Sequence, residues 1–213
     1  MIPAEEAIQG LIAVGAEFHR RCWSLGTSSN YSVVASRDPL RLLITGSGFD
    51  KGRLQPGQFV VVDGAGLRID PAHPKPSAET LLHTLVASAT GAGSVLHTHS
   101  PWGTVLSEAA VRRGHLEIAG YEMLKGLAGI ATHETAVRVA VVPNTQDIRS
   151  LAESLRPRFA AGDPTLRHGF LMAGHGLYTW GVDLAEARRH VEVLEFLFEV
   201  LGKRLSTPGL SNL

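Results

Sequence analysis

Short strand-like apolar runs alternate along this chain with longer segments of helical periodicity, and this alternation constrains the fold more than any other feature of the sequence. The apolar residues of 4–18 share one side of a 3.6-residue spiral. A second helical pattern, 81–89, leads directly into the strand-like run 95–99. Helices interleaved with strands are typical of a sheet covered by helices. We therefore predict an α/β fold.

The rest of the chain continues this pattern without a break in composition. Further strands are predicted at 41–45, 59–63, 67–70, 137–142, 170–173 and 177–180. Further helices are predicted at 102–111 and 122–127, after Asn144-Thr145, and from Asp183 to about Lys203. We find no internal repeat and no low-complexity linker. At 213 residues the chain is therefore expected to form one domain, with a loose tail from Ser206 to Leu213.

Composition and charge exclude several classes of partner. Twenty Lys and Arg residues balance twenty Asp and Glu residues, so the formal net charge is zero. A neutral chain has no global basic field for nucleic acid or an anionic membrane. We see no apolar run long enough to span a membrane, no signal-peptide pattern in 1–6, and only one cysteine, Cys22. We expect a cytoplasmic protein without nucleic-acid or membrane partners.

Two histidines separated by one residue are the strongest chemical signal. His97 and His99 belong to the run 95–99, and residues i and i+2 of a strand project from the same face, roughly 7 Å apart. His175, between two glycines in a tight turn, is the leading candidate for a third ligand. Three imidazoles leave one position of zinc open, which is the catalytic pattern. The other histidines are given structural or surface roles: His19, His73, His83, His115, His133, His168 and His190.

Three short segments combine hydroxyl groups with glycines or with a helix start: 27–30, 45–48 and 76–79. Backbone N–H groups and hydroxyls in such places bind anions. The same residues are also ordinary in turns and caps, and both interpretations stay open. A Walker loop and a dinucleotide glycine pattern are both absent, which disfavours nucleotide binding. The candidate substrate-binding residues are Ser28, Ser29, Asn30, Thr45, Gly46 and Ser77.

Two glutamates are candidates for proton transfer. Glu122 begins a short predicted helix between glycines, and Glu79 follows the segment that contains Ser77. Each is also explained as an ordinary charge in a first helical turn. Their candidacy rests on the combination with a metal site, because a metal that polarises a carbonyl needs a separate group to move protons on the adjacent carbon.

Taken in order, these segments resemble the class II aldolase/adducin family of zinc sugar-phosphate enzymes, over residues 5–203 and without the tail 204–213. The resemblance implies a single three-layer α/β/α domain with a mainly antiparallel central sheet. It also implies one zinc ion per subunit on His97, His99 and His175, a phosphate cradle in the Ser/Thr-rich loops, and a ring-like homotetramer. The segments are Thr27-Ser28-Ser29-Asn30, Thr45-Gly46-Ser47-Gly48, Lys75-Pro76-Ser77-Ala78-Glu79, His97-Thr98-His99-Ser100 and Gly174-His175-Gly176.

Three further segments, 120–126, 142–145 and 175–181, are similar to a dehydratase branch of that family. This branch acts in methionine salvage. The implied reaction removes water from 5-methylthioribulose 1-phosphate and gives 2,3-diketo-5-methylthiopentyl 1-phosphate. Glu122 matches the glutamate proposed for proton transfer in this branch. Glu79 matches the base of related aldolases, which not every dehydratase keeps, so its role stays open between base, metal-facing carboxylate and structural acid.

Two alternatives remain beside the dehydratase. The first is another zinc sugar-phosphate aldolase or 4-epimerase, of the fuculose 1-phosphate or ribulose 5-phosphate type, which uses the same three histidines. The second is a non-catalytic adducin-like interaction domain. In such domains the ligand histidines are usually lost, whereas all three matching positions are histidine in this chain.

Overall fold

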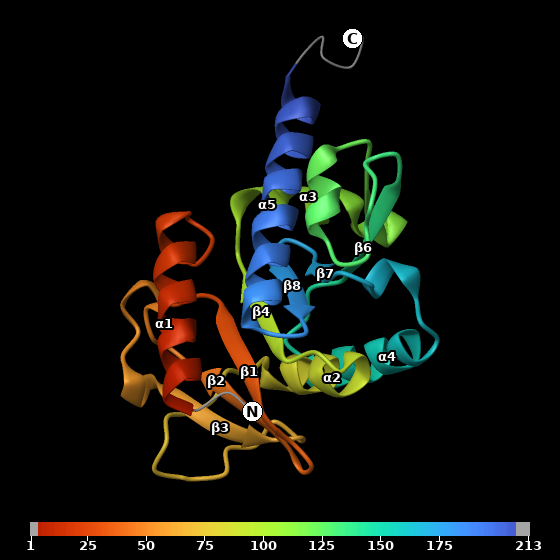
Figure 1. Cartoon of the computed structure of the whole chain (residues 1–213). Helices are drawn as coiled ribbons and strands as arrows, with labels where there is room; N and C mark the ends of the chain where they lie inside the picture. Colours follow the sequence, from red (N-terminus) through yellow and green to blue (C-terminus); the bar gives the residue numbers. More distant parts are fainter. Residues whose placement is uncertain (1–3, 208–213) are drawn as a thin grey trace.

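One mixed sheet runs through the molecule in the order β3-β2-β1-β4-β8-β7-β6-β5 (Figure 1). The computed structural model describes residues 4–207, and within them every neighbouring pair of strands is antiparallel except β6 and β7. This confirms the predicted α/β class and the mainly antiparallel sheet. The strands are β1 (Asn30–Arg37), β2 (Leu40–Thr45), β3 (Phe59–Asp63), β4 (Ser94–Thr98), β5 (His115–Ala119), β6 (Ala136–Val142), β7 (Phe170–Met172) and β8 (Gly176–Gly181).

Helices cover both faces of the sheet and complete the three layers (Figure 1). Helices α2 (Thr80–Thr90) and α4 (Ile148–Ala160) pack on one face, where their apolar side chains share a core with those of seven strands. Helices α1 (Ala4–Arg20), α3 (Pro101–Ala110) and α5 (Leu184–Ser206) pack on the other face in two further apolar clusters. The predicted three-layer α/β/α architecture is thereby confirmed.

Polar side chains fix where the helices begin. Asp183 accepts a hydrogen bond from the backbone N–H of Glu186 at 2.8 Å, and the carboxylate of Glu186 accepts from the N–H of Val182 at 2.9 Å. The first bond is one half of the capping box expected from the sequence, whereas the second comes from Val182, one residue before the N-cap, and not from Asp183 itself. Ser100 caps α3 in the same way, because its hydroxyl accepts from the N–H of Gly103. This cap follows His99 directly, two residues after Thr98, the last residue of β4.

Several elements differ from the sequence-based prediction. Strands β1 and β5 were not predicted, whereas 67–70 forms no strand and contributes only an isolated bridge between Val62 and Arg68. The predicted helix 122–127 is a 3-10 segment, Glu122–Gly126. Helix α5 continues to Ser206, and residues 208–213 of the predicted tail lie outside the described residues.

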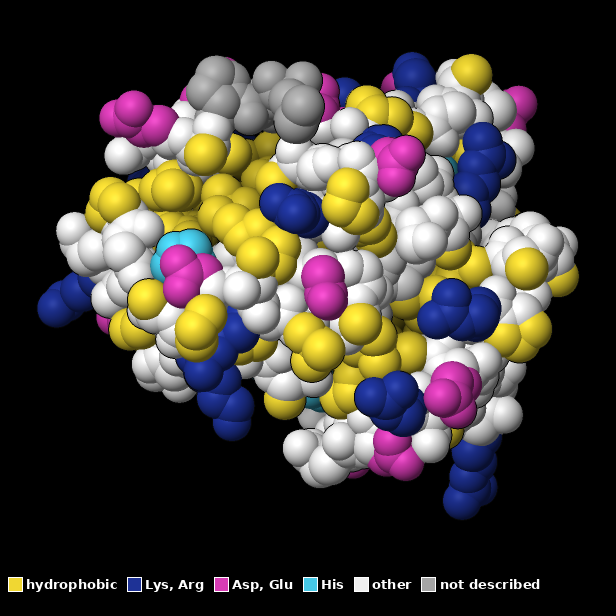
Figure 2. All heavy atoms as spheres, turned by 90° about the horizontal axis from the view of Figure 1, so that it is seen from below, with side chains coloured by type: hydrophobic (Ala, Val, Ile, Leu, Met, Phe, Trp, Pro, Cys, Tyr) yellow, Lys and Arg dark blue, Asp and Glu magenta, His cyan; other side chains and the backbone are white. Residues whose placement is uncertain are grey.

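The surface carries no strong charge bias on the face seen from below. Acidic and basic side chains are scattered there among patches of hydrophobic ones (Figure 2). This agrees with the balanced composition. In residues 4–207, no helix has the length and apolar character needed to cross a bilayer.

Candidate active site

Three histidines from two segments converge at one end of the sheet. His97 lies near the end of β4 and His99 just beyond it, whereas His175 lies in the turn between β7 and β8. Because β4 pairs with β8, with His97 opposite Tyr178, that turn is held beside the end of β4. One ring nitrogen from each histidine lies within 4.8 Å of the other two. This side-chain cluster is able to hold a metal ion.

His97 is fixed by its neighbours so that one nitrogen faces the cluster. Its side chain is fully buried and stacks on the ring of Tyr178, with 4.0 Å between centroids. Its Nδ1 donates to the carbonyl of Leu177 at 2.9 Å, which leaves the lone pair on Nε2. That Nε2 lies 2.8 Å from Nε2 of His99. Such an outer hydrogen bond is the usual way a protein orients a ligand histidine.

Two histidines of the cluster, His97 and His99, are held neutral. Burial, followed by the neighbouring imidazoles of His99 and His175, lowers the pKa of His97 well below its usual range. Burial also lowers the pKa of His99 to about 4, with smaller contributions from His175 and Lys51. Neutral imidazole is the form that binds a metal.

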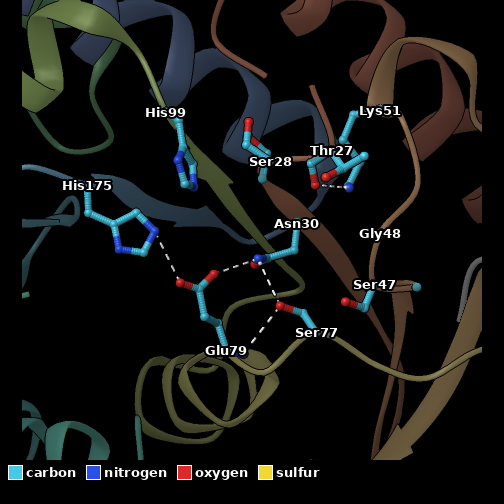
Figure 3. A pocket seen from close by; sticks show the side chains of 12 residues that line it. Thr27, Ser28, Asn30, Ser47, Gly48, Lys51, Ser77, Glu79, His99 and His175 are labelled. Carbon is cyan, nitrogen blue, oxygen red and sulfur yellow. Dashed lines mark hydrogen bonds and ion pairs between the residues drawn. The ribbon is translucent and has the colours of Figure 1, made fainter. Parts of the chain in front are cut away.

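A carboxylate completes the cluster. Glu79 lies directly before α2, and its Oε1 is 3.2 Å from Nε2 of His175. Its Oε2 is 3.5 Å from Nε2 of His97 and accepts a hydrogen bond from Nδ2 of Asn30 at 2.8 Å. Figure 3 shows Glu79 between His175 and Asn30. The structure therefore places an acceptor group beside the three imidazoles.

A buried chain of hydrogen bonds orients Asn30 from behind. Its Nδ2 donates to Glu79 and, at 3.2 Å, to Oγ of Ser77, while its Oδ1 accepts from Nε2 of His83. The hydroxyl of Ser32 donates to Nδ1 of His83 at 2.8 Å. Burial lowers the pKa of His83 to about 3, so this imidazole is neutral. His83 lies four residues after Glu79, and this spacing puts both side chains on one face of a helix. That spacing is the sequence signal that could have connected His83 with Glu79.

A pocket of about 140 Å³ opens next to the histidines (Figure 3). All three segments proposed to bind an anion reach it, although they lie far apart in the sequence. Its lining residues are Thr27, Ser28, Ser29, Asn30, Gly46, Ser47, Gly48, Lys51, Ser77, Glu79, His99 and His175. The pocket thus joins the imidazole cluster to a wall of hydroxyl groups and backbone amides.

One predicted substrate-binding residue lies behind this wall. Ser28, Ser29, Asn30, Gly46 and Ser77 all line the pocket. Thr45 does not: it is fully buried, and its hydroxyl accepts from the backbone N–H of Tyr31 at 3.2 Å. Thr45 therefore anchors the start of β1 beside the pocket.

Glu122 lies far from the histidines of its own chain. Strand β5 runs antiparallel to β6, so its end at Ala119 pairs with Ala136, whereas the other end of β6 points toward His175. The six steps from Ala136 to Val142 span roughly 20 Å. The side chain of Glu122 is 70% exposed and pairs with Lys125 at 2.6 Å. Its hydrogen bond with Lys125 holds its pKa below the usual range.

Two residues at this site were not singled out as site residues by the sequence. Lys51 is 1% exposed and lines the pocket. Its position between Gly48 and Gly52, next to an anion-binding candidate, was the available signal. Asn144 follows β6, and its Oδ1 lies 3.3 Å from Nδ1 of His175, in the position of an orienting partner.

Comparison with known families gives one match over most of the chain. The model of the "Class II Aldolase and Adducin N-terminal domain" matches residues 9–201. A methylthioribulose-1-phosphate dehydratase from Pseudomonas paraeruginosa is 46% identical over 203 residues, which are 95% of this chain and 96% of that protein. The enzyme of the same name from Sorangium cellulosum is 43% identical over 190 residues, covering 89% and 88%.

Solved structures of the same architecture show lower sequence identity. A putative aldolase/epimerase/decarboxylase from Escherichia coli superposes with a TM-score of 0.78 at 22% identity, covering 96% of this chain and 92% of that one. The L-fuculose-1-phosphate aldolase of Thermus thermophilus gives a TM-score of 0.73 at 23% identity, covering 95% and 97%. At this level of identity the likeness concerns the fold.

Proposed function

The chain belongs to the class II aldolase and adducin family, and from this premise we propose that it is a cytoplasmic, zinc-dependent methylthioribulose-1-phosphate dehydratase of methionine salvage. The observation that carries the proposal is the cluster of three imidazoles opening onto a hydroxyl-lined pocket. The name of the relatives that match nearly the whole chain at 43% to 46% identity supports the choice of reaction.

The donor set fits a catalytic zinc ion. His97, His99 and His175 would hold it through neutral imidazole nitrogens, and three such ligands leave a position for substrate. When bound, the ion supplies Lewis-acid polarisation of the substrate carbonyl. The hydrogen bonds from His97 to Leu177 and between His175 and Asn144 would keep these rings oriented.

The loops around the pocket bind the phosphate in this proposal. Oγ of Ser77 already accepts from Nδ2 of Asn30 and from the N–H of Glu79, both at 3.2 Å. Its own proton is therefore free to be donated to a phosphate oxygen. The residues assigned to substrate are Ser28, Ser29, Asn30, Gly46 and Ser77, while Thr45 supports them through β1.

The chain's acids move the protons of the dehydration. Removing the C3 proton needs a base next to the polarised carbonyl, and Glu79 is the carboxylate that lies there. The C4 hydroxyl then leaves as water once it has been protonated, and the enol tautomerises to the diketone. We assign this second proton transfer to Glu122, the residue favoured by the resemblance.

Because Glu122 lies at the far end of the sheet, it serves a site only in another copy of the chain. The homotetramer implied by the family resemblance would supply that copy. Mixed oligomers test the assignment: His97→Ala and Glu122→Gln proteins are each expected to be inactive alone. Refolded together, they should regain activity, because some sites then combine an intact metal site with an intact Glu122. Mixtures that stay as inactive as each variant alone would contradict the assignment.

Substrate tests separate this proposal from the alternative within the family. The purified protein should hold about one zinc ion per subunit and produce the diketone from methylthioribulose 1-phosphate. It should give no product from fuculose 1-phosphate or ribulose 5-phosphate. Turnover of either of those compounds, with none of the first, would favour an aldolase or a 4-epimerase.

A further inference from the structure

Lys51 is a buried cation without a carboxylate partner. Its side chain is 1% exposed, and its Nζ donates to the carbonyl oxygens of Phe49 at 2.7 Å and Thr27 at 3.3 Å. Within residues 4–207, no Asp or Glu oxygen lies within 4.0 Å of this nitrogen. The neighbouring carboxylate of Asp50 is instead bound to the N–H of Gly52 at 2.8 Å.

An ammonium in this environment would be stabilised by a nearby anion. Burying a charge is costly unless an opposite charge compensates for it, and carbonyl dipoles do so only in part. Burial indeed lowers the pKa of Lys51 to about 8, although the charge of Asp50 acts in the opposite direction. An ammonium has three N–H donors, and the two carbonyls use two of them.

The position of Lys51 indicates which kind of anion would bind there. Among the residues that line the pocket, Lys51 is the only lysine or arginine. Figure 3 shows it beside Thr27, on the same side of the pocket as Ser47 and Gly48 and away from His175. The hydroxyls and backbone amides of the loops offer hydrogen bonds but no full positive charge, whereas a phosphate ester carries up to two negative charges.

We propose that Lys51 is the charge-recognising residue of this pocket and selects a phosphate dianion over neutral or singly charged groups. The same ammonium ties the 27–30 loop to the segment before η1 (Lys51–Arg53), so binding of the anion and ordering of the two loops are coupled. The identity of the substrate rests on the proposed function, whereas the ligand class, an organic phosphate, follows from the lining and the charge of the pocket.

Binding of inorganic phosphate to the zinc-loaded protein tests the proposal directly. By calorimetry near neutral pH, Lys51→Met should bind phosphate about 30-fold more weakly, the loss typical of one charge-assisted hydrogen bond. Lys75→Met is the matched control, because Lys75 is exposed and adjoins the same loops without lining the pocket. It should stay within about twofold of the parent protein. Equal phosphate affinity of the Lys51→Met and parent proteins would overturn the proposal.

A measurement on the unaltered protein covers the case in which Lys51→Met fails to fold. Selectively labelled lysine side chains report their titration by NMR, and phosphate should raise the pKa of one buried lysine, because the anion stabilises the ammonium form. Absence of any such shift at saturating phosphate would also overturn the proposal.

Turnover separates this inference from the proposed reaction. Lys51→Met should raise KM for methylthioribulose 1-phosphate about 30-fold while changing kcat little, because uniform binding is lost. If the parent protein does not turn over this substrate but Lys51→Met still loses phosphate affinity, the proposed function fails and this inference stands. If the substrate is dehydrated and phosphate affinity is unchanged, only this inference fails.

Discussion

Replacement of the buried Glu195 by glutamine should stabilise the protein at alkaline pH. Glu195 lies on α5 beside Thr98, the last residue of β4, and is 3% exposed. Its Oε1 accepts a hydrogen bond from the hydroxyl of Thr98 at 2.8 Å. Its Oε2 has no hydrogen-bond partner within residues 4–207. Burial raises the pKa of Glu195 from 4.5 to about 7, although the hydroxyls of Ser100 and Thr98 act in the opposite direction.

The sign and the size of the effect follow from proton linkage. With the raised pKa, the folded state holds the proton of Glu195 more tightly than the unfolded state does. Folding therefore loses stability as the pH rises from about 4.5 to about 7, and the penalty stays constant above that range. A difference of about 2.5 units corresponds to about 3 kcal/mol. Glutamine keeps the size and the oxygen that faces Thr98 but does not ionise.

Urea unfolding at several pH values measures this effect. The free energy of unfolding of Glu195→Gln minus that of the parent protein should rise with pH by about 3 kcal/mol between about pH 5 and about pH 9. Metal-free protein at one fixed concentration is required. The buried histidines, whose lowered pKa values give the opposite trend, occur in both proteins and cancel in the difference.

Glu199→Gln, on the same helix, is the control. Glu199 is 48% exposed and pairs with Lys203, so its replacement should change stability by less than about 1 kcal/mol with little pH dependence. A stability difference for Glu195→Gln that does not vary with pH would refute the reasoning. So would a variant that is less stable than the parent protein in alkaline solution.

Four further outcomes are expected at the histidine cluster. Gly174→Ala should lower the free energy of unfolding in urea by about 1 to 2 kcal/mol, because φ is +64° at an otherwise open position. Gly176→Ala should abolish zinc binding, because its Cβ would collide with the carbonyl oxygen of Thr98. Asn144→Ala should weaken zinc affinity about 10- to 100-fold in chelator competition, because His175 loses its orienting partner; unchanged affinity would rule this role out. Removing the metal with a chelator should abolish turnover and lower Tm, and added zinc should restore both, since a ligand of the folded state stabilises it.

Strongly periodic segments and local spacing were predictable from the sequence. Helices α1 and α5 each bury one apolar face, which is the pattern that identified them. Helix α2 was identified by the same spacing, although the structure buries it almost all round over residues 82–87. The pairing of His97 with His99 on one face follows from strand geometry alone, because side chains alternate along a strand.

Strands β1 and β5 were not predictable in this way, because neither has a strong strand pattern in the sequence. Strand β1 is buried on both faces at its start and includes Asn30 and Ser32, whose polar side chains meet His83 and Glu79. A strand whose polar positions are paired inside the protein lacks the alternation that marks a half-buried strand. Strand β5 does alternate, with Leu116 and Ile118 buried, but it offers only these two large apolar residues, whereas β3 at the other edge of the sheet has Phe59 and three valines in a row.

The class of fold, the neighbouring histidines His97 and His99 and the loops able to bind an anion were readable from the sequence, because each depends on residues close together in the chain. The fold is what selects which of these groups meet. The pairing of β4 with β8 brings His175 to His97, the fold over about 50 residues brings Glu79 to Asn30, and the direction of β5 carries Glu122 to the far end of the sheet. Strand order and direction arise from packing the whole core, and no local pattern encodes them.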